Sequence, residues 1–345
     1  MLLGVLWLVV AAVAATAGST ALGRGVTQLA SRRRLPVAPV RSGVIGLAAA
    51  TATMLVAVGR GQTSIAGGIF PGTALFVLAA AFGAALLLGR RPTEVREPMG
   101  FVAAAAALVL IALLAADGEF TRGEGILLTL LFVPYASWAA MEPGRDPARG
   151  ADDREAPLGA PDPGWNWGPA LRAGPPAPDQ SQEPEPGRGA GKPPENTSST
   201  PQRALRSATG IALLAGGAFA LVEGTLRVAV RAPLGPGFAG AAIAGPIAAL
   251  PFAVLVLFPR ARPADADPPS AALGAVTGLV TLVPGLAAVV RPFELDGPAA
   301  VALLGAAGLF ALAGTWMLFR GRGGRVLGAL VLAAYAACLA YAGSL

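Results

Sequence analysis

Hydrophobic residues along this chain are gathered into ten continuous runs, separated by polar connections. A helix needs roughly 20 apolar residues to cross about 30 Å of hydrocarbon, and the runs are close to that length. A helix also satisfies the backbone N–H and C=O groups of such a run within lipid. We therefore predict an all-α integral membrane protein with about ten transmembrane helices, at residues 3–22, 42–59, 66–89, 99–116, 125–141, 205–222, 236–258, 271–290, 297–319 and 325–343.

A long polar segment divides the ten runs into two sets of five. Residues 142–203 are rich in Pro, Gly, Asp, Glu and Arg and poor in aliphatic side chains. Such a composition buries too little apolar surface to offset chain entropy. We predict a first five-helix membrane repeat at 1–141, a disordered linker at 142–203 and a second five-helix membrane repeat at 204–345. The first run lacks the positive start of a signal peptide, so we expect it to be retained.

The two sets of five helices read as copies of one another. Three short matches recur in chain order at nearly the same offset. Residues 21–25 match 220–224 at an offset of 199, and Gly83 matches Gly285 at 202. Arg122 and Tyr135 match Arg322 and Tyr335 at 200. Because each unit has five spans, the second copy must enter the bilayer from the opposite side. Inverted repeats of this kind are common in secondary transporters, which bind substrate near the bilayer midplane.

The arginines in the connections predict the orientation. Thirteen lie in the connections after spans one, three, seven and nine. The connections after spans two, four, six and eight hold five, namely Arg60, Arg122, Arg227, Arg231 and Arg291. By the positive-inside rule, we predict a multi-pass protein of the cell membrane with a cytoplasmic linker and both termini outside. This placement accounts for the net charge of +6 without a nucleic acid as partner.

The residue types needed for catalysis are scarce. The chain has no histidine and one cysteine, Cys338, which excludes His-based catalysis, imidazole ligands, a disulfide and a multi-cysteine metal site. No nucleophile–base pair or metal cluster is found, so we predict neither an enzyme nor a bound cofactor or metal. The predicted partners are the lipid bilayer and a protein engaged through the linker.

Several stretches have the residues and spacing of one transporter family. They are 18–30, 44–47, 60–66, 117–135, 221–224, 250–251, Arg262 and 285–292. In these stretches the chain resembles the calcium/cation antiporters in their bacterial ten-helix sodium/calcium exchanger form, over nearly its whole length apart from the linker. In that family each half carries G-T-S-x-P-E and G-N-x-x-G-S-N-x-x-N motifs, whose glutamates and asparagines bind cations at mid-membrane. The resemblance implies an antiporter-like protein for ion transport.

The positions that would bind the cation are apolar here. Gly68 and Gly72 keep family glycines, but the second span looks about eight residues short and lacks the T-S-x-P-E segment. Other motif positions that lack ligands are Ile69, Ala74, Val77, Phe252, Ala275, Val276 and Leu279. A hard cation such as Ca²⁺ prefers 6–8 oxygen ligands. We therefore predict a degenerate site without the usual Ca²⁺ or Na⁺ coordination.

Four polar side chains remain as candidates for a substrate or ion pathway. Glu223, near the end of the sixth span, either couples protons or pairs with Arg227 one helical turn on. Thr51, Thr53 and Thr73 either supply oxygens or form hydrogen bonds within their own helices, as threonines in membrane helices often do.

Three functional hypotheses follow from the sequence. The first is a degenerate cation-antiporter relative that keeps the inverted-repeat scaffold. The second is a non-transporting membrane scaffold that binds a partner through Gly/Ala-rich surfaces or the linker. The third is a secondary transporter of a small, weakly polar solute.

Overall fold

Helices account for nearly all of the chain that the structure describes. The computed structural model describes residues 2–32, 37–88, 93–94, 98–141, 200–257, 268–320 and 322–345. The first repeat consists of α1 (Leu2–Arg32), α2 (Val37–Gly59), α3 (Thr63–Leu78), a π-helical segment (Ala79–Ala84) that continues into α4 (Ala85–Leu88), α5 (Pro98–Leu114) with a 3₁₀ turn (Ala115–Asp117), and α6 (Arg122–Met141).

The second repeat has the same order of helices. It consists of α8 (Thr200–Arg231), α9 (Pro236–Ala239), a π-helical segment (Gly240–Ala244) that continues into α10 (Gly245–Leu257), α11 (Pro268–Val290), α12 (Gly297–Arg320) and α13 (Arg325–Gly343). With α3–α4 and α9–α10 each taken as one continuous stack, the described residues form ten helical rods. The predicted all-α membrane fold of about ten helices is confirmed.

The helices have the length and surface of membrane spans. Six described segments are long and apolar enough to cross a bilayer: Leu2–Val26, Thr63–Leu88, Ser207–Arg231, Pro236–Leu257, Gly297–Met317 and Arg325–Gly343. Three further apolar helices are shorter: Ile45–Gly59, Val102–Asp117 and Gly274–Val290. Large apolar side chains such as Leu113, Leu130 and Leu304 are exposed around the bundle, which suits a lipid surround rather than water.

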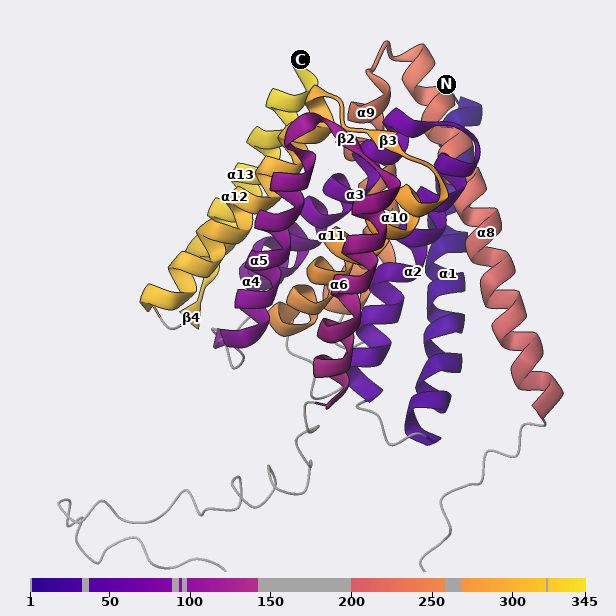
Figure 1. Ribbon diagram of the computed structural model, residues 1–345, viewed down its shortest axis with the longest axis horizontal. Helices are drawn as coiled ribbons and strands as arrows, with labels where there is room; N and C mark the ends of the chain where they lie inside the picture. The colour runs from indigo at the N-terminus through magenta and orange to yellow at the C-terminus, as the bar shows by residue number, and fades with distance from the viewer. Residues whose placement is uncertain are drawn as a thin grey trace, which may run out of the picture. The chain divides into compact units, whose positions relative to one another are not determined.

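Two helices extend beyond the apolar runs that predicted them. α1 has 31 residues and α8 has 32, which at 1.5 Å per residue gives each a length of roughly 47 Å. The C-terminal end of α1 and the N-terminal end of α8 lie at the end of the bundle opposite to both termini (Figure 1). In the sequence, the residues beyond the apolar runs at these ends include Arg24 in α1 and Arg203 in α8. Hydrophobicity marks where a helix lies in hydrocarbon, whereas the helix itself continues into the polar interface.

Both repeats belong to one compact unit, Met1–Glu142 with Arg203–Leu345. Within this unit the N-terminal end of α1 and the C-terminal end of α13 lie at one end of the bundle, whereas α6 ends and α8 begins at the other (Figure 1). This placement is the one required by two repeats of five spans each. Of the predicted linker, residues 142–199 lie outside the described residues, so their disorder remains a prediction. Residues 200–203, which were also assigned to the linker, instead form the start of α8, because the helix begins before the apolar run.

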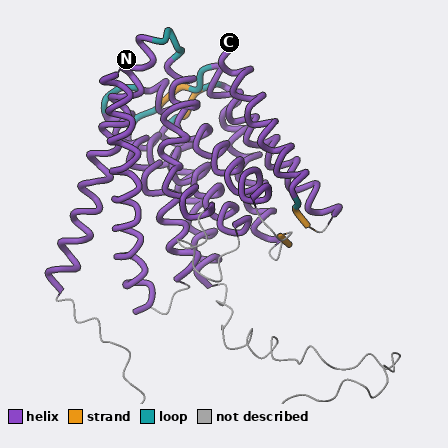
Figure 2. Tube along the Cα trace, turned by 180° about the vertical axis from the view of Figure 1, so that it is seen from behind, coloured by secondary structure: helices purple, strands orange, loops and turns teal. Residues whose placement is uncertain are grey.

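Two short strand pairs connect the repeats, one at each end of the bundle (Figure 2). β1 (Thr93–Glu94) pairs with β4 (Arg322–Gly323), and β2 (Glu119–Phe120) pairs with β3 (Phe293–Glu294), both antiparallel. β1 and β3 join the third and fourth rods of their repeats, and β2 and β4 join the fourth and fifth. A two-fold axis that exchanges the repeats therefore turns one pair into the other, as expected of inverted copies.

Glycine contacts obey the same two-fold relation. A Cβ added to Gly125 in α6 would lie 2.8 Å from the carbonyl oxygen of Gly285 in α11. At the equivalent place, a Cβ on Gly328 in α13 would lie 2.7 Å from the carbonyl oxygen of Gly83. The Gly83–Gly285 match keeps its offset of 202 residues, but Gly125 and Gly328 are 203 apart. In the structure, residues of α6 thus correspond to residues of α13 at an offset of 203, which is three more than the offset of 200 in the Arg122–Arg322 match. The starts of the helices agree with this, because α6 begins at Arg122 and α13 at Arg325.

Candidate functional site

The two repeats meet where α3 packs against α9 and α10. Glycines bring the backbones into contact there. A Cβ added to Gly68 would overlap the carbonyl oxygen of Gly237, and one added to Gly72 would overlap the carbonyl oxygen of Ala241. Small residues let membrane helices approach this closely and gain van der Waals contact. The glycine positions at 68 and 72 therefore build the crossing of the repeats.

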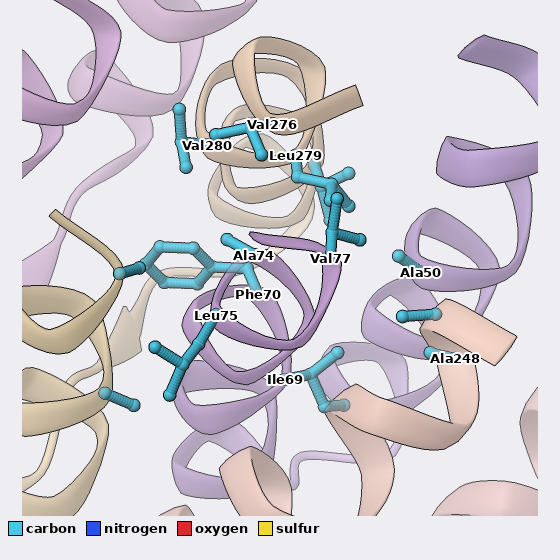
Figure 3. Packing of buried hydrophobic residues seen from close by; sticks show 14 of the residues in the cluster. Ala50, Ile69, Phe70, Ala74, Leu75, Val77, Ala248, Val276, Leu279 and Val280 are labelled. Atoms are coloured by element: carbon cyan, nitrogen blue, oxygen red, sulfur yellow. The ribbon is translucent and has the colours of Figure 1, made fainter. Parts of the chain in front are cut away.

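All seven positions that were predicted to lack ligands lie in one apolar cluster around this crossing. Each of them has zero solvent exposure. They are Ile69, Ala74 and Val77 of α3, Phe252 of α10, and Ala275, Val276 and Leu279 of α11. The side chains drawn in Figure 3, from these helices and their neighbours, carry carbon atoms only. The seven positions that were predicted to correspond to motif ligands are therefore close-packed hydrocarbon in the described structure.

Phe252 is the residue that the sequence resemblance pairs with a motif glutamate. Its ring packs on Gly46 of α2, where an added Cβ would lie 3.2 Å from the ring atom Cδ2 and 3.4 Å from the Cβ of Ala275. Three helices therefore meet at this ring with little space between them. α2 itself has 23 residues, because the helix begins at Val37, before the apolar run, and its apolar part is Ile45–Gly59. The predicted shortfall of about eight residues relative to the family motif stays a prediction.

The three candidate threonines do not form an open polar pathway. The Thr53 hydroxyl is buried and donates to the carbonyl of Ala49 at 2.7 Å. The Thr73 hydroxyl, also buried, lies 2.7 Å from the carbonyl oxygen of Ile69 and 3.2 Å from that of Gly245 on the other repeat. Thr51 is half-buried. Thr53 thus follows the expectation of bonding within its own helix, and Thr73 additionally joins the two repeats.

Two further buried threonines on α11 were missed by sequence reasoning. Thr281 donates to the carbonyl of Thr277 at 2.6 Å, so its hydroxyl is also bonded within its own helix. Their one-turn spacing in an apolar helix is the only clue that could have singled them out. Among the described residues, no group of three or more His, Cys, Asp or Glu side chains is placed to hold a metal ion.

Glu223 lies in an ion-paired cluster at the end of α2. Its Oε1 is 2.8 Å from Arg227 Nε, the predicted pairing one turn along α8, and its Oε2 is 3.1 Å from Arg60 Nη2 just past α2. The Arg60 guanidinium also lies 4.6 Å from the centre of the Phe219 ring. The partnership with Arg60 was not predicted, because it joins residues 163 positions apart.

We expect Glu223→Gln to lower stability modestly, by about 1 kcal/mol or less, because both ion pairs are partly exposed to solvent. Thermal unfolding of the purified protein measures this loss. Arg60→Gln should lower the stability by about as much. The double variant should lose less than the sum of the two single losses, since both changes remove the same Arg60–Glu223 contact. Strict additivity would show that the Arg60–Glu223 pair contributes nothing.

The first half of the chain matches a known family. Residues 3–141 fit the family described as sodium/calcium exchanger protein. The match covers the first five helices and bears out the resemblance inferred from sequence. A comparison with curated proteins gives no match. Together with its long apolar helices, the match makes the chain a multi-pass membrane protein.

Several solved structures share this fold over nearly the whole length of the chain. The H⁺/Ca²⁺ exchanger CAX is 11% identical with a TM-score of 0.66, covering 98% of this chain and 85% of its own. YfkE is 15% identical with a TM-score of 0.60, covering 98% and 92%. The sodium-calcium exchanger NCX_Mj is 16% identical with a TM-score of 0.58, covering 99% and 98%. At these identities the likeness establishes the fold of both exchanger repeats.

Helix caps at the connections of this exchanger fold were also missed by sequence reasoning. Asp296 caps two helices at once: Oδ1 accepts from the N–H of Ala299 in α12 and Oδ2 from the N–H of Gly237 in α9, both at 3.0 Å. Thr121 and Glu124 form a reciprocal capping box at the start of α6, with the Thr121 N–H 2.7 Å from the Glu124 carboxylate. The T-x-x-E spacing could have predicted the second cap, whereas the first requires the tertiary fold.

Proposed function

We propose that this protein is an exchanger-family membrane scaffold whose mid-membrane crossing is sealed, and that it does not exchange Ca²⁺ or Na⁺ through a carboxylate site. The observation that carries the proposal is the full burial of seven apolar side chains at the motif positions. In the same proposal it spans the cell membrane with both termini outside and residues 142–203 in the cytoplasm, as the arginine distribution favours.

The physical argument rests on the ligand requirement of the cation. Ca²⁺ needs 6–8 oxygen ligands to replace its hydration shell. The buried Thr53, Thr73 and Thr281 hydroxyls could offer at most one oxygen each, and the side chains of the surrounding cluster are hydrocarbon. Removing water from a cation would therefore cost more free energy than coordination by these groups returns. The crossing thus favours close packing over ion binding.

The ion pairs of Glu223 argue against proton coupling by that residue. Two guanidiniums contact both of its carboxylate oxygens, at 2.8 and 3.1 Å, so the side chain is already engaged in structural ion pairs. In this proposal Glu223 therefore supplies no driving proton for the uphill transport of a weakly polar solute. These points support the scaffold over the alternative of a solute transporter.

Ion flux in proteoliposomes tests the proposal directly. Two of the similar structures are described as an H⁺/Ca²⁺ exchanger and a sodium-calcium exchanger, so those are the activities to measure. We expect ⁴⁵Ca²⁺ uptake driven by a Na⁺ or proton gradient to equal that of protein-free liposomes. A known exchanger reconstituted in parallel shows that the gradients are effective. Saturable, gradient-driven uptake by this protein would overturn the proposal.

A further inference from the structure

Four of the five arginines on the predicted outer side come together at one corner of the bundle. Arg60 follows the last residue of α2, Arg227 and Arg231 lie in the last two turns of α8, and Arg291 follows the last residue of α11. The fifth, Arg122, begins α6. The connections on this side hold few basic residues, so this clustering is a product of the fold and not of a generally basic surface.

Close contacts bring these arginines into one group. Glu223 binds two of them, Arg60 and Arg227, on opposite oxygens. The guanidinium of Arg291 lies beside Gly61, 3.1 Å from where a Cβ would stand, and Arg231 lines the same surface hollow as Arg227. These four arginines and Glu223 together carry a net charge of +3. Arg60 and Arg227 are also partly exposed, so the positive charge faces the surroundings.

A wide-open apolar hollow on the surface of α8, called the groove below, adjoins this charge. Leu226, Arg227, Val230 and Arg231 line a shallow hollow of about 220 Å³. Val230 is 82% exposed, and the ring of Trp7 lies 5.9 Å from the Arg227 guanidinium. A hydrocarbon strip that ends in guanidiniums, at the end of a membrane helix, matches a molecule with an apolar tail and an anionic head.

We propose that this corner, defined by Arg60, Arg227, Arg231 and Arg291 with the groove on α8, binds an anionic phospholipid. The phosphate lies on Arg227 and Arg231, and an acyl chain lies along Leu226 and Val230. Arginine suits this role because its guanidinium donates two parallel hydrogen bonds to phosphate oxygens.

Cations near helix C-termini also interact favourably with the helix dipole. That effect accounts for Arg231 as the last residue of α8. It does not explain why Arg60 and Arg227 turn toward one shared carboxylate, or why a groove lies beside them. A soluble anion would use the charge alone and leave the apolar groove empty, so the groove favours a lipid.

Native mass spectrometry of the full-length protein in neutral detergent tests this lipid site. The protein is titrated with dioleoylphosphatidylglycerol and, separately, with dioleoylphosphatidylcholine. We expect one tightly bound phosphatidylglycerol, weaker phosphatidylcholine binding, and about fivefold lower phosphatidylglycerol affinity in Arg231→Gln, since one arginine near a lipid surface contributes about that much. Val230→Glu, which places a negative charge in the groove, should lower the affinity at least as much.

Arg122→Gln is the matched control, because it removes the one outer arginine that lies away from the corner. It should leave phosphatidylglycerol affinity unchanged, and gel filtration checks that all variants fold. Equal affinity for the two lipids would overturn the proposal. So would a loss of phosphatidylglycerol affinity in Arg122→Gln as large as that in Arg231→Gln. Competition by millimolar inorganic phosphate would also overturn it, because the site would then recognise a free anion.

Discussion

Gly72→Ala is expected to destabilise the protein severely, by about 3 kcal/mol or more. The added Cβ would overlap the carbonyl oxygen of Ala241 and lie 2.7 Å from its carbonyl carbon. Inserting even one carbon into a well-packed core costs about 1–3 kcal/mol when side chains can adjust. Here the obstacle is backbone of a neighbouring helix, so the cost lies at or above the upper end. The crossing of α3 with α9 and α10 would have to open.

Gly216→Ala is the matched control for this prediction. Gly216 lies in α8, and an added Cβ would meet nothing within 4 Å. Because alanine favours a helix over glycine by about 1 kcal/mol, this variant should be neutral or slightly stabilised. Thermal midpoints of the two purified variants in one detergent measure the difference. Equal midpoints would show that the close backbone contact at Gly72 does not hold the repeats together.

The architecture could be predicted because each rule behind it acts locally along the chain. Bilayer thickness fixes the length of an apolar run, and the five-span unit fixes the inversion of the second copy. The ends of α1 and α8 could not be predicted this way, because their last turns are polar. The correspondence between α6 and its equivalent in the second repeat, α13, was also predicted three residues away from the one in the structure. Ala- and Gly-rich helices align well with one another at several sequence offsets.

At the candidate site, the sequence allowed the burial of its apolar side chains to be anticipated, but not its contacts between the repeats. Comparison with the motif placed Phe252 and Leu279 where ligands would stand, and the structure packs both into the core. The pairing of Glu223 with Arg60, however, depends on two repeats meeting in space. A residue's own neighbours in sequence, such as Arg227 one turn away, are the only ionic partners that a helical pattern can predict.

Phe252→Glu is expected to be the second most damaging change, and it bears directly on the proposed function. Phe252 has zero exposure and packs on Gly46 beside Ala275. An uncompensated charge in such a place costs about 3–5 kcal/mol. We expect little correctly folded Phe252→Glu protein, whereas Phe252→Leu, which stays apolar, should lose only about 1 kcal/mol.

Calcium decides whether that glutamate restores a family-type site. A ligand present at 100 times its dissociation constant stabilises the folded state by about 2.7 kcal/mol. If latent ligands surrounded position 252, excess CaCl₂ would raise the thermal midpoint of Phe252→Glu well above that of Phe252→Leu treated in the same way. We expect no such rise, because one carboxylate among Gly46, Ala275 and the hydrocarbon of α3 supplies too few oxygens for Ca²⁺. A calcium-specific rescue, absent with Mg²⁺, would mean that backbone carbonyls at this crossing still form a cation site.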